Sequence, residues 1–298
     1  MFNQIRQGDL KGSSSAGVME FGVDTLPPLQ KDAGDRNRTS PFAFTGNRFE
    51  FRAVGSNQSV AGPLVAMNTI LADALQWVAD ELERLIQAGK PLNEAAFEVL
   101  RQVMNEHGNV IFGGDGYSSE WHRMAVEERG LENLRTSAQA LPVLERPEIA
   151  DLFERQGVLS RVELQSRYEV YAEQYILAIE VEAKLALRIA RTQIAPAVQA
   201  ALGDMASSLA ERKAAGLATD SRLADRIAAL EGEMLNQIDA LEKALGEAPH
   251  GSAAHMGHCA DVLLPTMLQL RQAVDALEPL VDDSLWPLPT YQEMLFLR

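Results

Sequence analysis

The six residues NRFEFR, at positions 47–52, combine strand-forming aromatic residues with a regular alternation of charge. Successive side chains of a β-strand point to opposite faces, so we predict a strand over residues 47–54 with the two phenylalanines on one face. The charged residues share the other face: Arg48, Glu50 and Arg52. Such a row is costly to bury unless the charges meet a ligand or each other. The simpler alternative is an exposed ladder of salt bridges, since alternating charge is typical of a solvated surface.

Two further arginines, Arg36 and Arg38, stand just upstream, which places four arginines within 17 residues of an otherwise acidic chain. The planar guanidinium group makes paired hydrogen bonds to carboxylates and phosphates. A carboxylate between two arginines has the chemistry of a Mg²⁺ ligand, because hard cations prefer oxygen donors. The segment is therefore a candidate site for an anionic substrate and a divalent cation, with Glu50 as the candidate metal ligand.

Most of the remaining chain has a helical pattern. Leucines and other apolar residues recur every three or four positions over residues 63–88, and a second helix is predicted near 92–106, after Pro91. A long helical tract covers residues 161–214, where Pro196 should kink or restart the helix. The next helix, over residues 222–245, carries an apolar stripe typical of a helical hairpin: Leu223, Ile227, Leu230, Met234, Ile238, Leu241 and Leu245.

A third helix of this region is predicted near residues 253–281. The breaks at Ala215-Gly216 and Pro249-His250-Gly251 are short, so neighbouring helices should run antiparallel. We predict an α+β fold that is predominantly helical. Trp77, Trp121 and Trp286 are predicted to be core anchors. His107 and His122 stand alone and are predicted to be ordinary surface or packing residues.

Composition narrows the functional classes. The chain has 298 residues and a formal net charge of −15, which argues against a general role in binding nucleic acid or anionic lipid. Cys259 is the single cysteine, so a reducing cytoplasm is the expected setting. No uninterrupted apolar run approaches the roughly 20 residues that span a bilayer. We therefore expect a cytoplasmic protein with neither nucleic-acid nor membrane partners.

One cluster has the composition of a metal site. His255, His258 and Cys259 stand at i, i+3 and i+4, a spacing that can place side chains on one helix face. Zinc favours such ligands. The cluster nevertheless follows a helix-breaking proline and glycine at the junction of a loop and a helix. Ordinary packing residues are the interpretation that the sequence favours.

Four stretches together resemble the long-form, type III glutamine synthetases. They are residues 31–52, residues 54–63, the segment Phe112 to Ser118, and the segment Trp286 to Tyr291. The resemblance implies the end of a catalytic sheet or barrel followed by a helical hairpin or bundle. It also implies a C-terminal portion of such an enzyme, with catalytic-domain residues 1–185 and a helical domain over 186–298.

The resemblance implies a reaction in which ATP phosphorylates glutamate to a γ-glutamyl phosphate and ammonia then displaces phosphate. Glu50 corresponds to a ligand of Mg²⁺ (or Mn²⁺), and Arg48 to an arginine at the ATP phosphates. Arg52 corresponds to an arginine at glutamate and the transferred phosphate, and Arg38 to one that binds the acid substrate or the phosphoryl group. Arg36 is given a supporting role. A homo-oligomer is implied when the full enzyme is present.

Two departures accompany the resemblance. Ala43 stands where shorter glutamine synthetases have another arginine, as in type III enzymes, and Gly113 stands where type III sequences usually have Asn. The loop that contains Gly113 is accordingly given no catalytic role. Most metal ligands and the acidic flap residue of the family belong to segments upstream of Met1, so we expect the isolated chain to be inactive. The alternative is a non-catalytic helical assembly or regulatory remnant of that enzyme.

Overall fold

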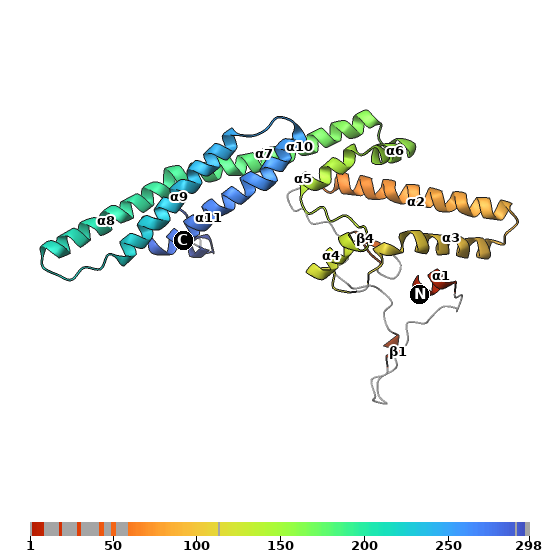
Figure 1. The fold of residues 1–298 in the computed structure, drawn as a ribbon, viewed down its shortest axis with the longest axis horizontal. Helices are drawn as coiled ribbons and strands as arrows, with labels where there is room; N and C mark the ends of the chain where they lie inside the picture. The colour runs from red at the N-terminus through yellow and green to blue at the C-terminus, as the bar shows by residue number, and fades with distance from the viewer. Residues whose placement is uncertain are drawn as a thin grey trace. The chain divides into compact units, whose positions relative to one another are not determined.

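The structure is a computed structural model. It describes residues 2–8, 18–19, 29–30, 42–44, 49–51, 59–112, 114–289 and 291–295. The chain divides into two compact units, each described by itself below. The first unit comprises Met1–Leu134 and Ala150–Arg161, and the second comprises Arg135–Ile149 and Val162–Arg298. Helices predominate among the described residues (Figure 1), which confirms the predicted helical character. The predicted domain boundary between residues 185 and 186 stays a prediction.

The first unit contains short strands and several helices. Its strands are β1 (Val18–Met19), β2 (Leu29–Gln30), β3 (Phe42–Phe44) and β4 (Phe49–Phe51). Both β1–β2 and β3–β4 pair antiparallel. Its helices are α1 (Phe2–Gln7), α2 (Ala61–Gln87), α3 (Leu92–His107), the 3₁₀ turn η1 (Gly108–Val110), α4 (Ser119–Glu127) and most of α6 (Pro147–Arg155). Residues 49–51 of the strand predicted over 47–54 form β4, and the rest of that range lies outside the described residues. A catalytic sheet around β4 stays a prediction.

A helical hairpin forms the core of the first unit. Leu85 of α2 packs with Ala95 and Val99 of α3, and the partly buried Trp77, Val78 and Leu82 cover this small cluster. The turn between the two helices contains Gly89 at φ +91°, a conformation that side chains other than glycine rarely adopt. Lys90 and Glu98 form an ion pair beside the turn. The helices predicted over 63–88 and 92–106 are thus confirmed within two residues at each end.

The regular secondary structure described in the second unit is entirely helical. It contains α5 (Ser137–Ala140), the 3₁₀ turn η2 (Leu141–Glu145), α7 (Arg161–Ile189), the π-helical turn η3 (Ala190–Ile194), α8 (Ala195–Ala214) and α9 (Arg222–Gly246). After these come α10 (Ser252–His258), the π-helical turn η4 (Cys259–Leu263), α11 (Leu264–Leu277), the 3₁₀ turn η5 (Glu278–Leu280) and α12 (Tyr291–Leu295).

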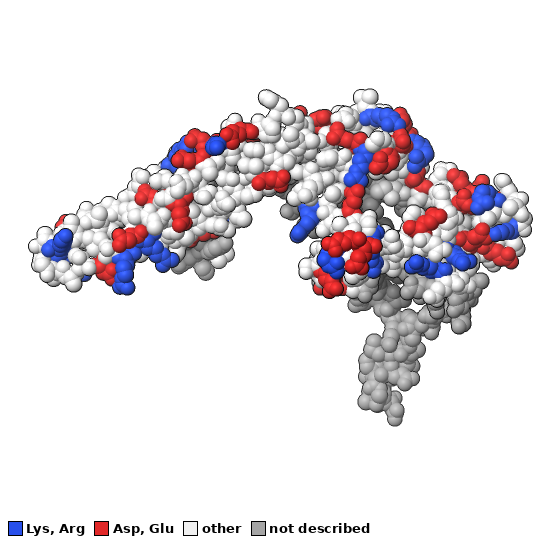
Figure 2. Space-filling model, in the orientation of Figure 1, with Lys and Arg blue, Asp and Glu red and all other residues white. Residues whose placement is uncertain are grey.

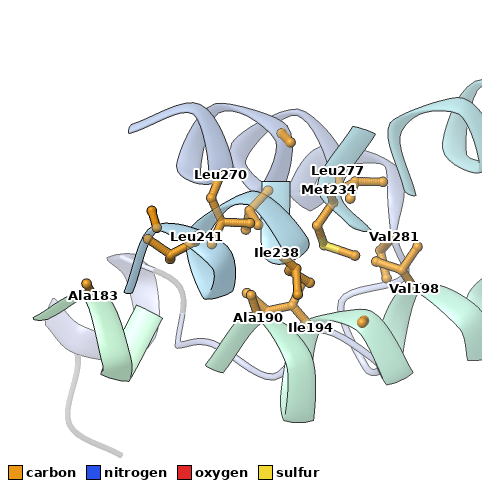
Figure 3. Packing of buried hydrophobic residues seen from close by; sticks show 14 of the residues in the cluster. Ala183, Ala190, Ile194, Val198, Met234, Ile238, Leu241, Leu270, Leu277 and Val281 are labelled. Atoms are coloured by element: carbon orange, nitrogen blue, oxygen red, sulfur yellow. The ribbon is translucent and has the colours of Figure 1, made fainter. Parts of the chain in front are cut away.

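The core of the second unit lies where α9 packs against α8 and α11 (Figure 3). Met234 and Leu241 of α9 are fully buried, and Ile238 between them is 3% exposed. Side chains from the neighbouring helices complete the cluster, among them Ala190, Ile194, Val198, Leu270 and Leu277. The predicted stripe of α9 is therefore confirmed over most of its length. Leu223 is the exception, because it stands at the exposed first turn of the helix.

One π-helical turn joins α7 to α8, and another joins α10 to α11. In both cases a proline is the second residue of the helix that follows. Ala195 donates its backbone N–H to the carbonyl of Ala190, five residues back, and Pro196 follows. Leu264 likewise donates to the carbonyl of Cys259, and Pro265 follows. A proline has no N–H to donate and its ring crowds the preceding turn, so a wider turn at this point accommodates it. The interruption predicted at Pro196 is confirmed, whereas the equivalent one at Pro265 was not predicted.

A glycine with positive φ lies in the connection on each side of α9. Gly216 has φ +75°, and its N–H bonds to the carbonyl of Lys213 while the N–H of Leu217 bonds to that of Arg212. This pair of hydrogen bonds is the Schellman motif. Gly251 precedes α10 with φ +92°. Both predicted breaks between the helices are thus confirmed.

Candidate functional site

The hairpin of β3 and β4 carries the one predicted site residue that the structure describes. In its antiparallel register Phe42 pairs with Phe51, Ala43 with Glu50, and Phe44 with Phe49. Glu50 is partly buried. Its carboxylate oxygens suit a hard divalent cation, but a single carboxylate supplies only part of the six or more oxygen ligands that Mg²⁺ or Ca²⁺ requires. Ala43 lies directly opposite Glu50 in the hairpin.

The predicted arginines of the site lie outside the described residues. This applies to Arg38, Arg48 and Arg52, and also to the supporting Arg36. Whether they gather around Glu50 therefore stays a prediction.

A second group of residues, which sequence reasoning did not assign, fixes the segment between α3 and α4. The rings of Phe112 and Trp121 stack with centroids 3.8 Å apart and an interplanar angle of 15°. The guanidinium carbon of Arg129 lies 4.9 Å from the centroid of Trp121 and 5.8 Å from that of Phe112, within the range of cation–π attraction. We call Arg129, Phe112 and Trp121 the arginine clamp.

Hydrogen bonds extend the arginine clamp to the backbone. Arg129 Nη1 donates to the carbonyl oxygen of Ile111 at 2.7 Å and to that of Asn109 at 3.2 Å. In return, Asn109 Nδ2 donates to the carbonyl oxygen of Arg129 at 3.3 Å. One side chain thus satisfies two carbonyls of a segment that has no regular secondary structure beyond η1. Trp121 is partly buried and stacks on Phe112, outside the hydrophobic core clusters, so its predicted role as a core anchor stays a prediction.

The loop after Phe112 is shaped by its own polar side chains. Asp115 Oδ1 accepts the backbone N–H of Tyr117 at 2.9 Å. Ser118 caps α4, because its hydroxyl accepts the backbone N–H of Trp121 at 3.2 Å. His122 Nε2 lies 3.1 Å from the carbonyl oxygen of Gly116, which agrees with its predicted packing role. These hydrogen bonds fix the backbone of the loop, while the side chain of Tyr117 is 71% exposed.

The histidine and cysteine cluster of the second unit has separate partners for each member. His255 Nε2 lies 3.0 Å from a carboxylate oxygen of Glu180 on α7. His258 Nε2 lies 2.8 Å from the carbonyl oxygen of Ala244 on α9. Cys259 is fully buried in the main core, and burial raises the pKa of its thiol. Among the residues that the structure describes, no three His, Cys, Asp or Glu side chains gather as metal ligands.

The carboxylate of Glu180 contacts two basic side chains, Lys184 and His255. Lys184 Nζ donates to Glu180 at 2.6 Å, and His255 contacts the other carboxylate oxygen. The bond from Lys184, followed by the influence of His255, holds the pKa of Glu180 below its usual value. A shallow cavity of about 350 Å³ lies here, lined by Glu173, Ile176, Leu177, Glu180, Gly251, Ser252 and His255. Ser252 also donates its hydroxyl to Glu169 at 2.6 Å, so α10 is fastened to α7 at two points.

A charged contact in the first unit joins α2 to α6. Arg155 Nη2 donates to Asp73 Oδ1 at 2.8 Å, and Gln156 Nε2 donates to the same oxygen at 2.9 Å. The hydrogen bond from Arg155 lowers the pKa of Asp73 below its usual value.

None of the described helices combines the length and the apolar character needed to cross a bilayer.

Comparison with known proteins identifies the family. Residues 95–213 match the model of the glutamine synthetase C-terminal domain. The type-3 glutamine synthetase of Dictyostelium discoideum is 34% identical over 310 residues, which cover 99% of this chain. The chain belongs to the glutamine synthetase family. Glutamine synthetases of Bacteroides fragilis and Butyrivibrio fibrisolvens are 29% and 32% identical over 94% and 89% of the chain.

The match covers only part of each relative. The chain spans about two fifths of the length of these glutamine synthetases: 41%, 40% and 38% in the order given above. It therefore corresponds to a C-terminal portion of a type-3 glutamine synthetase, as the sequence motifs predicted. The segment that matches the C-terminal domain contains the arginine clamp and Glu180, whereas Glu50 lies before it.

Proposed function

We propose that this chain is a portion of an ATP-dependent glutamate–ammonia ligase that forms glutamine through a γ-glutamyl phosphate. The observation that carries the proposal is the match of 99% of the chain to a type-3 glutamine synthetase. The strand motif supports it, because a purely structural helical protein has no need of Arg, Glu and Arg on one strand. Glutamate, ammonia and ATP are the substrates that this assignment implies.

In this proposal Glu50 supplies one carboxylate to Mg²⁺ or Mn²⁺, from a partly buried position on β4. A divalent cation supplies charge neutralisation at the phosphates during phosphoryl transfer. Arg48 would hold the phosphates of ATP. Arg38 and Arg52 would hold the glutamate carboxylate and the phosphoryl group, since paired hydrogen bonds from a guanidinium fit both anions.

The proposal includes inactivity of the isolated chain. One metal-ligating carboxylate and three arginines cannot align two substrates and a nucleotide, and loss of alignment forfeits most of the rate advantage of a bound complex. The rest of the ligand set would come from the remaining length of the enzyme, which the matched relatives also carry. The proposed homo-oligomer likewise belongs to the complete enzyme.

A chimeric enzyme tests the assignment. The stretch of the Dictyostelium protein that matches this chain is replaced by the 298 residues, and glutamine formation from glutamate, ammonia and MgATP is measured. We expect activity in the chimera and none in the isolated chain. Glu50→Gln should lower the activity of the chimera at least about 100-fold and raise the Mg²⁺ concentration needed for half-maximal rate. Glu233→Gln, at an exposed position of α9, is the matched control and should change neither quantity.

Two outcomes would overturn the catalytic proposal. The first is full activity of the Glu50→Gln chimera with an unchanged Mg²⁺ requirement. The second is glutamine formation by the isolated chain at the rate of the chimera, which would overturn the predicted inactivity.

A second candidate function is a non-catalytic helical assembly or regulatory protein. The observation that favours it is the large buried core of the second unit, which the chain forms from its own helices. Binding of MgATP separates the two candidates at equilibrium. The isolated chain should bind no MgATP if it is a helical assembly protein.

A further inference from the structure

The first half of α2, together with Val60 before it, has an unusual surface, which we call the apolar half-helix (residues 60–75). Six large apolar side chains of this segment are exposed by 42% to 59%: Val60, Leu64, Val65, Ile70, Leu71 and Leu75. Only Thr69 is buried there. A soluble helix normally exposes polar residues and buries apolar ones, so this surface needs an explanation.

The exposed apolar side chains spread over more than half of the helix circumference rather than forming one narrow stripe, and Thr69 and Asp73 lie on the remaining side. At about 100° per residue, Leu64, Leu71 and Leu75 fall within about 40° of one another. Val65 lies about 100° to one side of Leu64, and Ile70 about 120° to the other. An apolar surface this wide is more typical of a helix in the interior of a protein than of a surface helix. A single flat partner surface would leave part of it in water.

The scarcity of charged residues also indicates that the apolar half-helix is a buried surface. Asp73 is the one charged residue between positions 60 and 75, and Arg155 and Gln156 already bond its carboxylate. The second half of α2 differs, since it carries Asp80, Glu81, Glu83 and Arg84. On the face shown in Figure 2, charged side chains are plentiful over the far end of α2 and over α3. The exposed leucines of α7 are likewise interleaved with charges, such as Glu180, Glu182 and Lys184.

We infer that the apolar half-helix docks into a socket formed by the part of the glutamine synthetase polypeptide that lies outside the matched stretch. This inference rests on the proposed function. The Dictyostelium relative matches 99% of this chain, so the matched stretch includes α2, and about three fifths of its length is further polypeptide. That length is sufficient to enclose a helix of four to five turns on several sides, whereas a second copy of the chain would cover one face.

A membrane surface fits the apolar half-helix less well. Helices that lie on a bilayer carry one apolar face, a polar opposite face and usually basic residues. Residues 60–75 contain no Lys or Arg. The chemistry therefore favours a proteinaceous, apolar socket.

Thiol labelling tests the inference directly. Leu71→Cys and Glu83→Cys each place one thiol at an exposed position of α2, and the native Cys259 is fully buried. Labelling rates are compared between the isolated chain and the chimera described above. We expect Leu71→Cys to react at least about tenfold more slowly in the chimera, because the socket excludes the reagent. Glu83→Cys, the control on the same helix, should react at rates within twofold of each other in the two proteins.

The outcomes separate this inference from the proposed function. An inactive chimera with a protected Leu71→Cys would contradict the function and leave the docking intact. An active chimera in which Leu71→Cys reacts as fast as in the isolated chain would overturn the docking alone. Protection of the isolated chain by phospholipid vesicles, or protection that grows with its concentration, would also overturn the inference in favour of a membrane or a second copy.

A second variant keeps the test informative if the chimera does not assemble. Leu71→Ser with Leu75→Ser in the isolated chain should leave the thermal midpoint within about 2 °C, since surface substitutions usually change stability by under about 0.5 kcal/mol. It should also reduce binding of a dye that reports exposed apolar surface. A much larger fall in the midpoint would show that these leucines pack within the chain, and the inference would fail.

Discussion

At the scale of single residues, Arg129 has the most consequences for its surroundings. It contacts two aromatic rings and two backbone carbonyls, so it holds a segment that has little regular structure. Sequence reasoning missed this role, because a single arginine two residues after α4 has no periodic or motif signal. Glu50 is the opposite case. The alternation of NRFEFR placed it on a strand, and β4 confirms that placement.

We predict that Arg129→Ala lowers the free energy of unfolding by about 1–2 kcal/mol. The estimate combines an exposed cation–π contact of about 0.5–1 kcal/mol with the partial loss of two charge-assisted hydrogen bonds. Urea unfolding followed by tryptophan fluorescence measures it, because Trp121 belongs to the clamp. Arg123→Ala is the control, since Arg123 makes only surface ion pairs with Glu127 and Glu128. Equal effects of the two substitutions would contradict the clamp.

Glu180 leads to a prediction on pH. Its pKa is lowered in the folded protein, first by Lys184 and then by His255, so the ionised carboxylate favours folding. This contribution is present above the pKa of a glutamate in the unfolded chain and is lost as the pH falls through the folded pKa. Glu180→Gln should therefore make the loss of stability smaller than in the unsubstituted chain as the pH falls below the usual pKa of a glutamate. Urea unfolding at several pH values measures the difference.

The control for Glu180 is Glu182→Gln, at an exposed position two residues further along α7. Its curve of stability against pH should keep the shape of the unsubstituted chain. If Glu180→Gln also keeps that shape, the contacts with Lys184 and His255 do not stabilise the fold.

At the scale of elements, the long helices could be predicted because their apolar residues recur at helical spacing. The apolar stripe of α9 predicted which side of the helix is buried, with Leu223, exposed at the first turn, as the exception. The π-helical turn before Pro265 could not be predicted, because periodicity over residues 253–281 continues through it. The gathering of four arginines around Glu50 stays a prediction, since Arg36, Arg38, Arg48 and Arg52 lie outside the described residues.

Two glycines of the α8–α9 region should respond to alanine in opposite directions. Gly216→Ala should destabilise the protein by about 1–2 kcal/mol, since the Schellman turn needs φ +75° there. Gly232→Ala, inside α9 with open space around its Cα, should stabilise it by about 0.5–1 kcal/mol through higher helix propensity. Thermal and urea unfolding of both variants measure the two signs. Stabilisation by Gly216→Ala would contradict the assigned backbone conformation.

At the scale of the whole molecule, the two units differ in the size of their cores. Nineteen residues form the main buried cluster of the second unit, whereas three form the cluster between α2 and α3. Burial of apolar surface is the dominant favourable contribution to folding, so stability should be uneven along the chain. The sequence did not reveal this difference, because α2 has a strong helical pattern but finds few buried contacts among the described residues.

We predict that amide hydrogen exchange in the isolated chain is slowest in α9 and α11 and at least about 100-fold faster in α2 and α3. The reason is that opening α9 exposes the large core, whereas opening α2 exposes little apolar surface that is not already in water. Exchange followed by mass spectrometry of peptides measures the ratio. Equal protection in the two hairpins would contradict the uneven distribution of stability.

The π-helical turns before Pro196 and Pro265 have a consequence for how homologous chains can vary in length. A π-helical turn holds one residue more than an α-helical turn, so deleting one residue there leaves the following helix facing the same neighbours. A deletion inside α9 would instead rotate everything after it by about 100°. A π-helical turn that loses one residue becomes an α-helical turn, which would crowd the ring of the proline after it. Homologues that lack one residue in 190–194 or 259–263 should therefore also lack the proline that follows.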